Sequence, residues 1–365
     1  MSIDRTTCVL CRCKDLENFY IVNKFPFLSL STDTHPSADI FSDLIFKVCS
    51  TCRCVQLTNL IDPSTLYSFD NKLQLTPLWI DHHTEFVKFI KDSVDTTSIC
   101  EVGGGSNPLY NFFKKNDIYY SILDLYDCSS INDSIVYKIG NCESYTNYSE
   151  DTVILSHTFE HLYSPHSFLE SISKSKVKNI MLSVPNLHSW LINKLTVNLL
   201  FNQHTFYFEL EQLSDLFNKY GYSIKSHDVF RNHSIFVHFV KSQSTDLNIR
   251  PISIEKSIYD HFNMKKINIE RIHLEGPTYI MPSFYIGQIL YHYLINKENI
   301  LGFLDNDINK CNKRLYGTPC MVYSPDIIKN LKNISIIVAI TPYYNEMYSQ
   351  LMKLNNTINI IKVVI

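Results

Sequence analysis

Glycine is scarce in this chain. Only 9 of its 365 residues are glycine, whereas average usage of about 7% would give about 26. Three of the nine are consecutive, Gly103 to Gly105, between the apolar run 98–102 and Pro108. Because glycine has no side chain, such a cluster in a glycine-poor chain indicates a place where something approaches the backbone closely.

Long hydrophobic runs and an excess of charge are also missing. The sequence has no stretch of about 20 apolar residues and no cleavable signal peptide, so we expect a protein of the reducing cytoplasm that has no membrane partner. The formal net charge is -3 and the pI is about 6.5. Since no basic cluster offsets this balance, nucleic acid is not an expected partner.

Several catalytic motifs are absent as well. No Gly-Lys-Ser/Thr follows the glycine cluster, which excludes a P-loop, and no G-x-S-x-G elbow is present for a serine nucleophile. His157 and His161 are four residues apart, but they belong to a different pattern, described below. A metalloenzyme is therefore not expected.

The glycine turn lies between elements of an α/β pattern. The run 98–102 predicts a strand, and a helix is expected over 107–116. A second β-type run, 119–123, ends in Asp124. In nucleoside-binding sheets a carboxylate at this place binds ribose hydroxyls and repels a 2′-phosphate, while the glycine turn receives the ligand. The alternative is that Asp124 only opens a surface turn.

Two further segments complete the pattern. Gly140-Asn141-Cys142-Glu143 follows, and residues 151–165 read D-T-V-I-L-S-H-T-F-E-H-L-Y-S-P. Together with E-V-G-G-G-S at 101–106 and the strand end at Asp124, these motifs resemble class I S-adenosylmethionine-dependent methyltransferases, in the same order. The resemblance implies a Rossmann-like α/β core that binds S-adenosylmethionine. Its implied cofactor contacts are Glu101, Gly103, Gly104, Gly105, Asp124, Asn141, Cys142 and His157.

Cysteines are concentrated near the amino terminus. Six of the eleven lie in the first 54 residues, in the strings C-V-L-C-R-C at 8–13 and C-S-T-C-R-C at 49–54. Two C-x-x-C knuckles can complete a tetrahedral four-thiolate zinc site, which has no open position for water and is therefore structural. Disulfides are the alternative, but a reducing compartment disfavours them. We expect Cys8, Cys11, Cys49 and Cys52 to bind Zn²⁺, with Cys13 and Cys54 as possible replacements within each string.

A second resemblance follows the cysteine pairs. Residues 52–57 (C-R-C-V-Q-L), Tyr67 and the string W-I-D-H-H at 79–83 are similar to the zinc-binding leader of the nucleotide-sugar C-methyltransferases. This implies a nucleotide-activated sugar as the substrate and a role in carbohydrate biosynthesis. A tyrosine that the family carries before this tryptophan has no clear equivalent at 69–73, and Tyr67 is close but offset.

The same resemblance points to a candidate base. Residues 201–208 read F-N-Q-H-T-F-Y-F where the family has Y-x-E-H-x-x-Y-F. His204, Tyr207 and Gln203 are therefore the expected catalytic residues, with His204, which titrates near neutrality, as the base. The change from glutamate to Gln203 removes a charge that would raise the basicity of His204.

Three functions stay open at this point. The first is methylation of a carbon atom of a keto sugar, which places the greatest demand on the base. The second is methylation of an oxygen or nitrogen atom of a sugar or glycan precursor. The third is a module that binds S-adenosylmethionine without turnover.

The chain is expected to form three units: a zinc module (1–75), the methyltransferase-like core (76–245) and a Rossmann-like α/β domain (246–365). The last resembles the same family through Asp305-Asn306-Asp307 and the segment 317–322. Its opening turn at 282–287 has one glycine where the family has G-x-G, so Gly287 and Asp305 are either scaffold or ligand contacts. In the core we expect helices at 81–94, 107–116, 165–174 and 209–219 and strands at 98–102, 119–123, 152–155, 179–184, 222–229 and 234–241.

Overall fold

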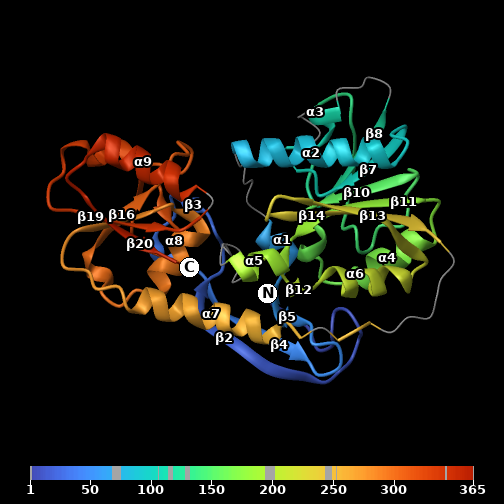
Figure 1. Ribbon diagram of the computed structural model, residues 1–365, viewed down its shortest axis with the longest axis horizontal. Helices are drawn as coiled ribbons and strands as arrows, with labels where there is room; N and C mark the ends of the chain where they lie inside the picture. Colours follow the sequence, from blue (N-terminus) through green and yellow to red (C-terminus); the bar gives the residue numbers. More distant parts are fainter. Residues whose placement is uncertain are drawn as a thin grey trace.

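The computed structural model (Figure 1) describes residues 2–67, 75–105, 107–113, 118–127, 132–193, 202–242, 249–251, 253–341 and 343–364. Its largest sheet has the strand order β13-β14-β11-β10-β7-β8-β9. The strands are β7 (Ser98–Val102), β8 (Tyr119–Asp124), β9 (Val136–Ile139), β10 (Thr152–Ser156), β11 (Asn179–Pro185), β13 (Tyr222–Phe230) and β14 (Ser234–Lys241). Only β14 runs against the others, because its pairings with β11 and β13 are antiparallel and the rest are parallel.

Helices cover both faces of this sheet, as Figure 1 shows. On one face lie α2 (Pro77–Ser93) and α3 (Tyr110–Phe113), and on the other α4 (Pro165–Ser173) and α6 (Leu210–Asn218). Successive strand residues point to opposite faces, so Ile99 and Ile154 pack with the α2 face, whereas Cys100 and Val153 pack with the α4 face. Strands that are buried on both sides need continuous apolar runs, and this is why they were recognisable in the sequence.

The predicted core elements are confirmed with small shifts of their ends. Helix α2 begins at Pro77, four residues before the predicted start, since proline is well suited to the first turn of a helix. Strand β9 was not predicted, because its burial pattern shows no buried residue. The predicted helix 107–116 is reduced to α3 among the described residues, and 114–117 lie outside them.

A four-stranded sheet of order β12-β5-β4-β2 forms the amino-terminal part. It contains β2 (Leu16–Pro26), β4 (Phe41–Cys49), β5 (Val55–Leu57) and β12 (Phe206–Tyr207), which comes from the methyltransferase-like core. Phe206 pairs with Gln56, and Tyr207 with Val55. The strand that follows His204 is therefore held by the amino-terminal sheet. Shorter elements nearby are β1 (Ser2–Asp4), β3 (Ser31–Thr32), β6 (Asn59–Ile61), α1 (Pro63–Leu66), α5 (Leu187–Asn193) and the 3₁₀ helices η1 (Pro36–Ala38) and η2 (Phe159–His161).

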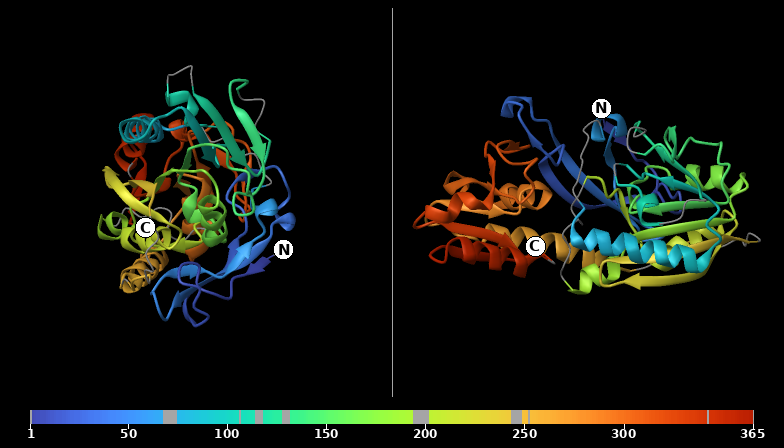
Figure 2. Two further views of the ribbon diagram at one scale, coloured as in Figure 1. Left: turned by 90° about the vertical axis from the view of Figure 1, so that its right-hand side faces the viewer. Right: turned by 90° about the horizontal axis from the view of Figure 1, so that it is seen from above.

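The carboxy-terminal sheet has the order β18-β16-β15-β19-β20, and all its pairings are parallel. Within the α/β domain expected over 246–365, a parallel βαβ unit is formed by β15 (Thr278–Met281), α8 (Phe284–Tyr293) and β16 (Ile300–Leu304). In Figure 2 this unit and the methyltransferase-like core lie side by side, with the blue amino-terminal strands alongside both. The remaining elements are α7 (Glu255–Glu270), η3 (Lys297–Asn299), β17 (Arg314–Leu315), β18 (Val322–Tyr323), η4 (Pro325–Asn330), β19 (Ser335–Ala339), α9 (Tyr344–Leu354) and β20 (Asn359–Val363).

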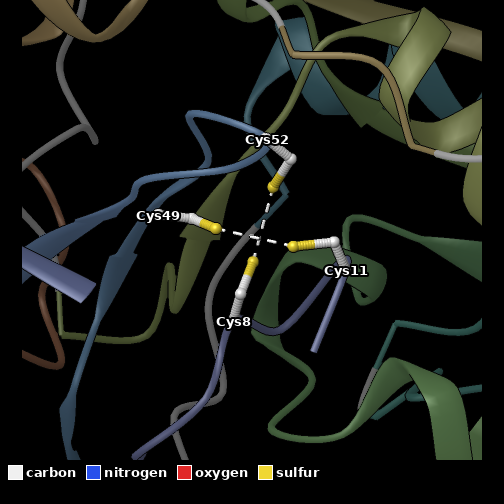
Figure 3. A group of neighbouring side chains, drawn as sticks. All are labelled: Cys8, Cys11, Cys49 and Cys52. Carbon is white, nitrogen blue, oxygen red and sulfur yellow. Dashed lines mark hydrogen bonds between the residues drawn. The ribbon is translucent and has the colours of Figure 1, made fainter. Parts of the chain in front are cut away.

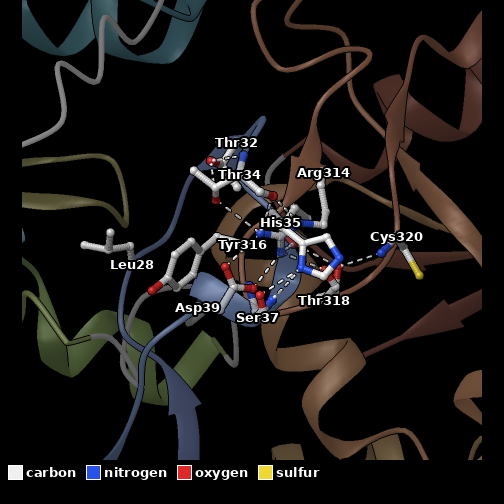
Figure 4. A network of polar contacts seen from close by, with 12 residues as sticks. Leu28, Thr32, Thr34, His35, Ser37, Asp39, Arg314, Tyr316, Thr318 and Cys320 are labelled. Atoms are coloured by element: carbon white, nitrogen blue, oxygen red, sulfur yellow. Dashed lines mark hydrogen bonds and ion pairs between the residues drawn. The ribbon is translucent and has the colours of Figure 1, made fainter.

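A buried ion pair joins the amino-terminal segment to the carboxy-terminal unit, next to the pairing of β3 with β17 (Figure 4). The Nη1 and Nη2 atoms of Arg314 lie 2.6 and 2.7 Å from the carboxylate oxygens of Asp39. The two side chains are only 6% and 2% exposed. Arg314 also donates to the carbonyls of Thr34 and Thr318, and the backbone N–H of Gly317 donates to Asp39. These bonds satisfy both charges, as a buried pair requires.

Breaking this pair should destabilise the protein strongly. Asp39→Ala leaves the Arg314 guanidinium buried without its carboxylate, which costs about 3–5 kcal/mol of the free energy of unfolding. As a control, Asp92→Ala removes an exposed pair with Lys88 and should cost less than about 1 kcal/mol. Denaturant unfolding measures the free energy of unfolding of both variants. A similar decrease in the two variants would contradict a large contribution of the buried pair to stability.

No helix in the described part of the chain combines the length and the apolar character needed to cross a bilayer.

Candidate active site

The glycine turn begins where β7 ends and approaches the segment after β10. Gly103 and Gly105 have φ angles of +75° and +51°, in the left-handed region that favours glycine. A Cβ atom on Gly103 would lie 2.9 Å from the Oγ1 atom of Thr158. Contact with Thr158 leaves no room for a side chain on Gly103, whereas the space around Gly105 is open.

Glu101 connects the strand before the glycine turn to neighbouring segments through hydrogen bonds. Its carboxylate accepts hydrogen bonds from the Tyr120 hydroxyl (2.6 Å) and the Leu109 backbone N–H (3.1 Å). The residue is 2% exposed, and this burial raises the pKa of its carboxyl group to about 7. A Cβ atom on Gly104 would come within 2.9 Å of the same carboxyl group. Glu101 thus ties together β7, β8 and the segment that leads into α3.

Asp124 lies directly against the glycine turn. It is the last residue of β8, and its Oδ2 atom accepts a hydrogen bond of 3.0 Å from the backbone N–H of Gly105. The side chain is half-buried, and burial raises the pKa of this carboxyl group above its usual range. The carboxyl ends of two neighbouring parallel strands therefore bring the glycine turn and the Asp124 carboxylate together. Nucleotide-binding folds of this kind bind their ligands at this edge of the sheet.

The next predicted residues continue from this edge. The backbone N–H of Gly140 donates to the carbonyl of Asp124 (2.8 Å), which places Asn141 and Cys142 beside the strand end. Cys142 is buried in the core that includes Leu123. The Asn141 side chain accepts from the backbone N–H of Glu143 (2.9 Å) and shapes the turn.

His157 belongs to a group of histidines around Trp79. Its φ angle is +50°, its Nε2 lies 2.8 Å from the hydroxyl of Ser234, and its Nδ1 lies 3.2 Å from an oxygen of Glu160. The ring of Trp79 meets that of His157 edge to face at 5.0 Å. Burial lowers the pKa of His157 well below its usual range, so its imidazole is neutral near pH 7.

The three predicted catalytic residues occupy different surroundings. His204 is 6% exposed, and its ring is stacked on Trp190 at 6.4 Å. Its burial, together with the neighbouring histidines, holds its pKa well below the usual range. Tyr207 is buried against Phe46 and α7, which favours a packing role, and Gln203 is half-buried.

A small cavity of about 20 Å³ opens beside His204. A carboxyl group and an imidazole, from Glu160 and His204, lie within 4.8 Å of each other in its lining. The lining residues are Glu160, Pro185, Leu187, Trp190, His204, Phe206, Tyr207 and Phe208. Glu160 is not among the residues predicted from the sequence. The signal that could have found it is its place in the string H-T-F-E-H, which directly follows β10.

The four predicted cysteines come together (Figure 3). Their Sγ atoms lie within 4.8 Å of one another, with 3.5 Å between Cys8 and Cys52 and between Cys11 and Cys49. These separations are far too long for a disulfide and suit four thiolates around one Zn²⁺ with bonds of about 2.3 Å. The set therefore fits a structural zinc ion.

The two cysteine strings adopt the same turn. In the first, the backbone N–H of Cys8 donates to Cys13 and that of Arg12 to Cys8; in the second, Cys49 donates to Cys54 and Arg53 to Cys49. Arg12 and Arg53 both have positive φ angles, 64° and 61°. Cys13 and Cys54 close the turns through their carbonyls, whereas the Sγ atoms of Cys11 and Cys52 lie in the four-sulfur group, which favours this ligand set.

The sequence was compared with known proteins. Residues 72–227 match a family model described as "Methyltransferase domain". The match indicates a methyltransferase domain over this part of the chain. The strand order described above is that of the class I S-adenosylmethionine-dependent methyltransferase fold, and together the two observations support a methyltransferase enzyme. No curated protein sequence matches the chain.

Solved structures similar to the domain include two methyltransferases. One is magnesium protoporphyrin IX methyltransferase from Synechocystis PCC 6803 with bound S-adenosylhomocysteine, at 12% identity and a TM-score of 0.37, covering 47% of this chain and 90% of that one. The other is the N-methyltransferase NodS from Bradyrhizobium japonicum WM9, at 8% identity and a TM-score of 0.37, covering 47% and 92%. A likeness at this level carries no argument about the substrate.

Proposed function

We propose that the methyltransferase domain transfers a methyl group from S-adenosylmethionine to a nucleotide-activated sugar. The observation that supports this most directly is the pairing of β12 with β5. It fastens the segment of His204 to the cysteine-bearing sheet, and the backbone N–H of Leu57 donates to the carbonyl of Thr205 at 2.9 Å. The part of the chain that resembles the leader of sugar methyltransferases thus positions the candidate acceptor site.

The residues of the cofactor end fit a sulfonium nucleoside. Gly103 and Gly105 hold the turn at positive φ angles, the space around a Cβ atom on Gly105 is open, and the half-buried Asp124 carboxylate lies against the turn. We infer that Asp124 accepts hydrogen bonds from the ribose hydroxyls and that the turn contacts the methionine part. S-adenosylmethionine supplies the methyl group as a sulfonium, ready for in-line displacement.

His204 is proposed to lie beside the acceptor atom. Its low pKa keeps the imidazole neutral, so a ring nitrogen can accept a hydrogen bond or a proton, but its basicity is reduced. This favours an oxygen or nitrogen acceptor of the sugar over a carbon atom beside a ketone, whose proton is harder to remove. Carbon methylation of a keto sugar with His204 as the base is the second candidate, supported by the match to Y-x-E-H-x-x-Y-F.

Incubation with isotopically labelled S-adenosylmethionine and a panel of hydroxy and 4-keto nucleotide sugars tests the proposal. Mass spectrometry of the products should show one added methyl group and locate its attachment atom. His204→Ala should lower the rate by about 10²–10⁴-fold while cofactor affinity is unchanged. His227→Ala, at an exposed histidine on β13, is the matched control and should keep full activity. Tight cofactor binding without any product would favour the non-catalytic module instead.

A further inference from the structure

A second group of metal-binding side chains lies apart from the cysteines. One ligand atom from each of Glu160, His161 and His204 lies within 4.8 Å of the others. The sequence gives no hint of this group as a unit, since His204 is 43 residues beyond His161. It is formed because β12 and η2 pack together, and the backbone N–H of Thr205 donates to the carbonyl of Glu160 at 3.0 Å.

Glu160 is an unusual carboxylate. It is 2% exposed, and neither of its oxygens accepts a hydrogen bond within the described part of the chain. The Nδ1 atom of His157 lies 3.2 Å from one oxygen but outside hydrogen-bonding geometry. A buried carboxylate without a partner is costly, and such a group usually has a role or an ion that compensates it.

Both histidines of the group have a ring nitrogen within 4.8 Å of this carboxylate. The rings of His161 and His204 are 5.2 Å apart. The hydroxyl of Tyr67 lies 3.3 Å from Nδ1 of His161 and can orient that ring. A hydrogen bond to the second ring nitrogen is the usual way in which proteins orient a metal-binding histidine.

We propose that Glu160, His161 and His204 bind one divalent transition-metal ion of the zinc class, separate from the ion at the four cysteines. Two imidazoles and one carboxylate are a donor set that catalytic zinc sites use, with a further position left for water or substrate. The cavity lined by Glu160 and His204 opens at this place. The four-thiolate set, by contrast, has no open position.

The role of this ion rests on the proposed methyl transfer. The open position would take a hydroxyl oxygen of the sugar, and coordination would lower the pKa of that hydroxyl so that its proton passes to water. The oxygen then forms the new bond to the methyl carbon, while the carbon–sulfur bond breaks and its electron pair stays on sulfur. In this arrangement His204 acts as a ligand, which agrees with a neutral imidazole and does not require a strong base.

Cobalt(II) substitution of the full chain tests the site, because the two donor sets give different spectra. Wild-type protein should take up a second equivalent of Co²⁺ whose weak visible bands lack the intense sulfur-to-metal absorption of the thiolate site. Glu160→Gln should bind Co²⁺ at this second site at least about 100-fold more weakly and keep the thiolate spectrum. Glu85→Gln, at an exposed position of α2, should behave as wild type.

If circular dichroism shows that Glu160→Gln does not fold, His161→Asn replaces it with the same expectation. A single equivalent of Co²⁺ in wild type, all of it thiolate-bound, would overturn the proposal, as would equal uptake by wild type and a folded variant. A second ion bound by a protein that methylates no sugar would contradict the proposed substrate alone. If protein that contains only the cysteine-bound ion is fully active, the second ion has no role in methyl transfer, and only that part of the proposal is contradicted.

Discussion

Cys49→Ser is expected to unfold the amino-terminal sheet, because we propose that Cys8, Cys11, Cys49 and Cys52 hold a structural zinc ion that this change would release. Cys8, Cys49 and Cys52 are at most 1% exposed. Loss of the ion would therefore leave their thiol groups buried together without the metal that bonds them to one another. Structural zinc contributes about 10–16 kcal/mol of apparent binding free energy in small folds. Few other single changes in this chain should have so large an effect.

The loss should spread to the methyltransferase domain. The Gln212 side chain on α6 donates to the carbonyl of Cys52 (2.8 Å), and a ring nitrogen of His166 on α4 lies 2.7 Å from the carbonyl of Leu10. Unfolding of the cysteine turns therefore removes contacts of two helices and of β12. Metal content by atomic emission and thermal unfolding should both change in Cys49→Ser.

Cys13→Ser is the matched control for this prediction. Cys13 lies in the same string but outside the four-sulfur cluster, and it is only half-buried. The variant should keep the zinc ion and the melting temperature of wild type. If Cys13→Ser lost the ion while Cys49→Ser retained it, the ligand set would be wrong.

Asp124→Ala is expected to lose most of the affinity for S-adenosylmethionine. Hydrogen bonds to a charged acceptor contribute about 1.5–3 kcal/mol each, so removal of the carboxylate should weaken binding by at least about 10–100-fold. The same change also removes the acceptor for the Gly105 N–H, which loosens the turn. Calorimetric titration with S-adenosylhomocysteine measures the loss directly.

Asp228→Ala provides the comparison, because this aspartate is exposed on β13. The affinity of the Asp228→Ala variant for S-adenosylhomocysteine should equal that of wild type. Unchanged affinity in Asp124→Ala, with the fold preserved, would mean that the carboxylate only closes the turn at the surface.

The contact of Asp124 with the glycine turn and the cysteine cluster were predictable from the sequence because each depends on local rules. Strands β7 and β8 are neighbouring parallel strands, so their carboxyl ends must meet, and this places Asp124 beside Gly105. The repeated C-x-x-C-R-C strings each build one turn. In both cases a short sequence pattern specifies the local backbone conformation, and burial of the surrounding residues stabilises it.

The partners of His204 could not be predicted in this way. Glu160 and His204 meet because β12 packs against η2 while β12 is also held by its pairing with β5 of the distant amino-terminal sheet, and no periodicity in the sequence encodes these contacts. The pair of Asp39 with Arg314 likewise joins residues 275 positions apart. Long-range contacts of single side chains follow from how the units pack, which composition and spacing leave open.

A crystal structure of the full chain soaked with S-adenosylhomocysteine tests the central claim most directly. We predict density for one nucleoside, with its ribose hydroxyls within hydrogen-bonding distance of Asp124 and its amino-acid part along Gly103–Gly105. A dinucleotide bound there from the expression host, or a nucleoside bound elsewhere while this edge stays empty at saturating concentration, would contradict it.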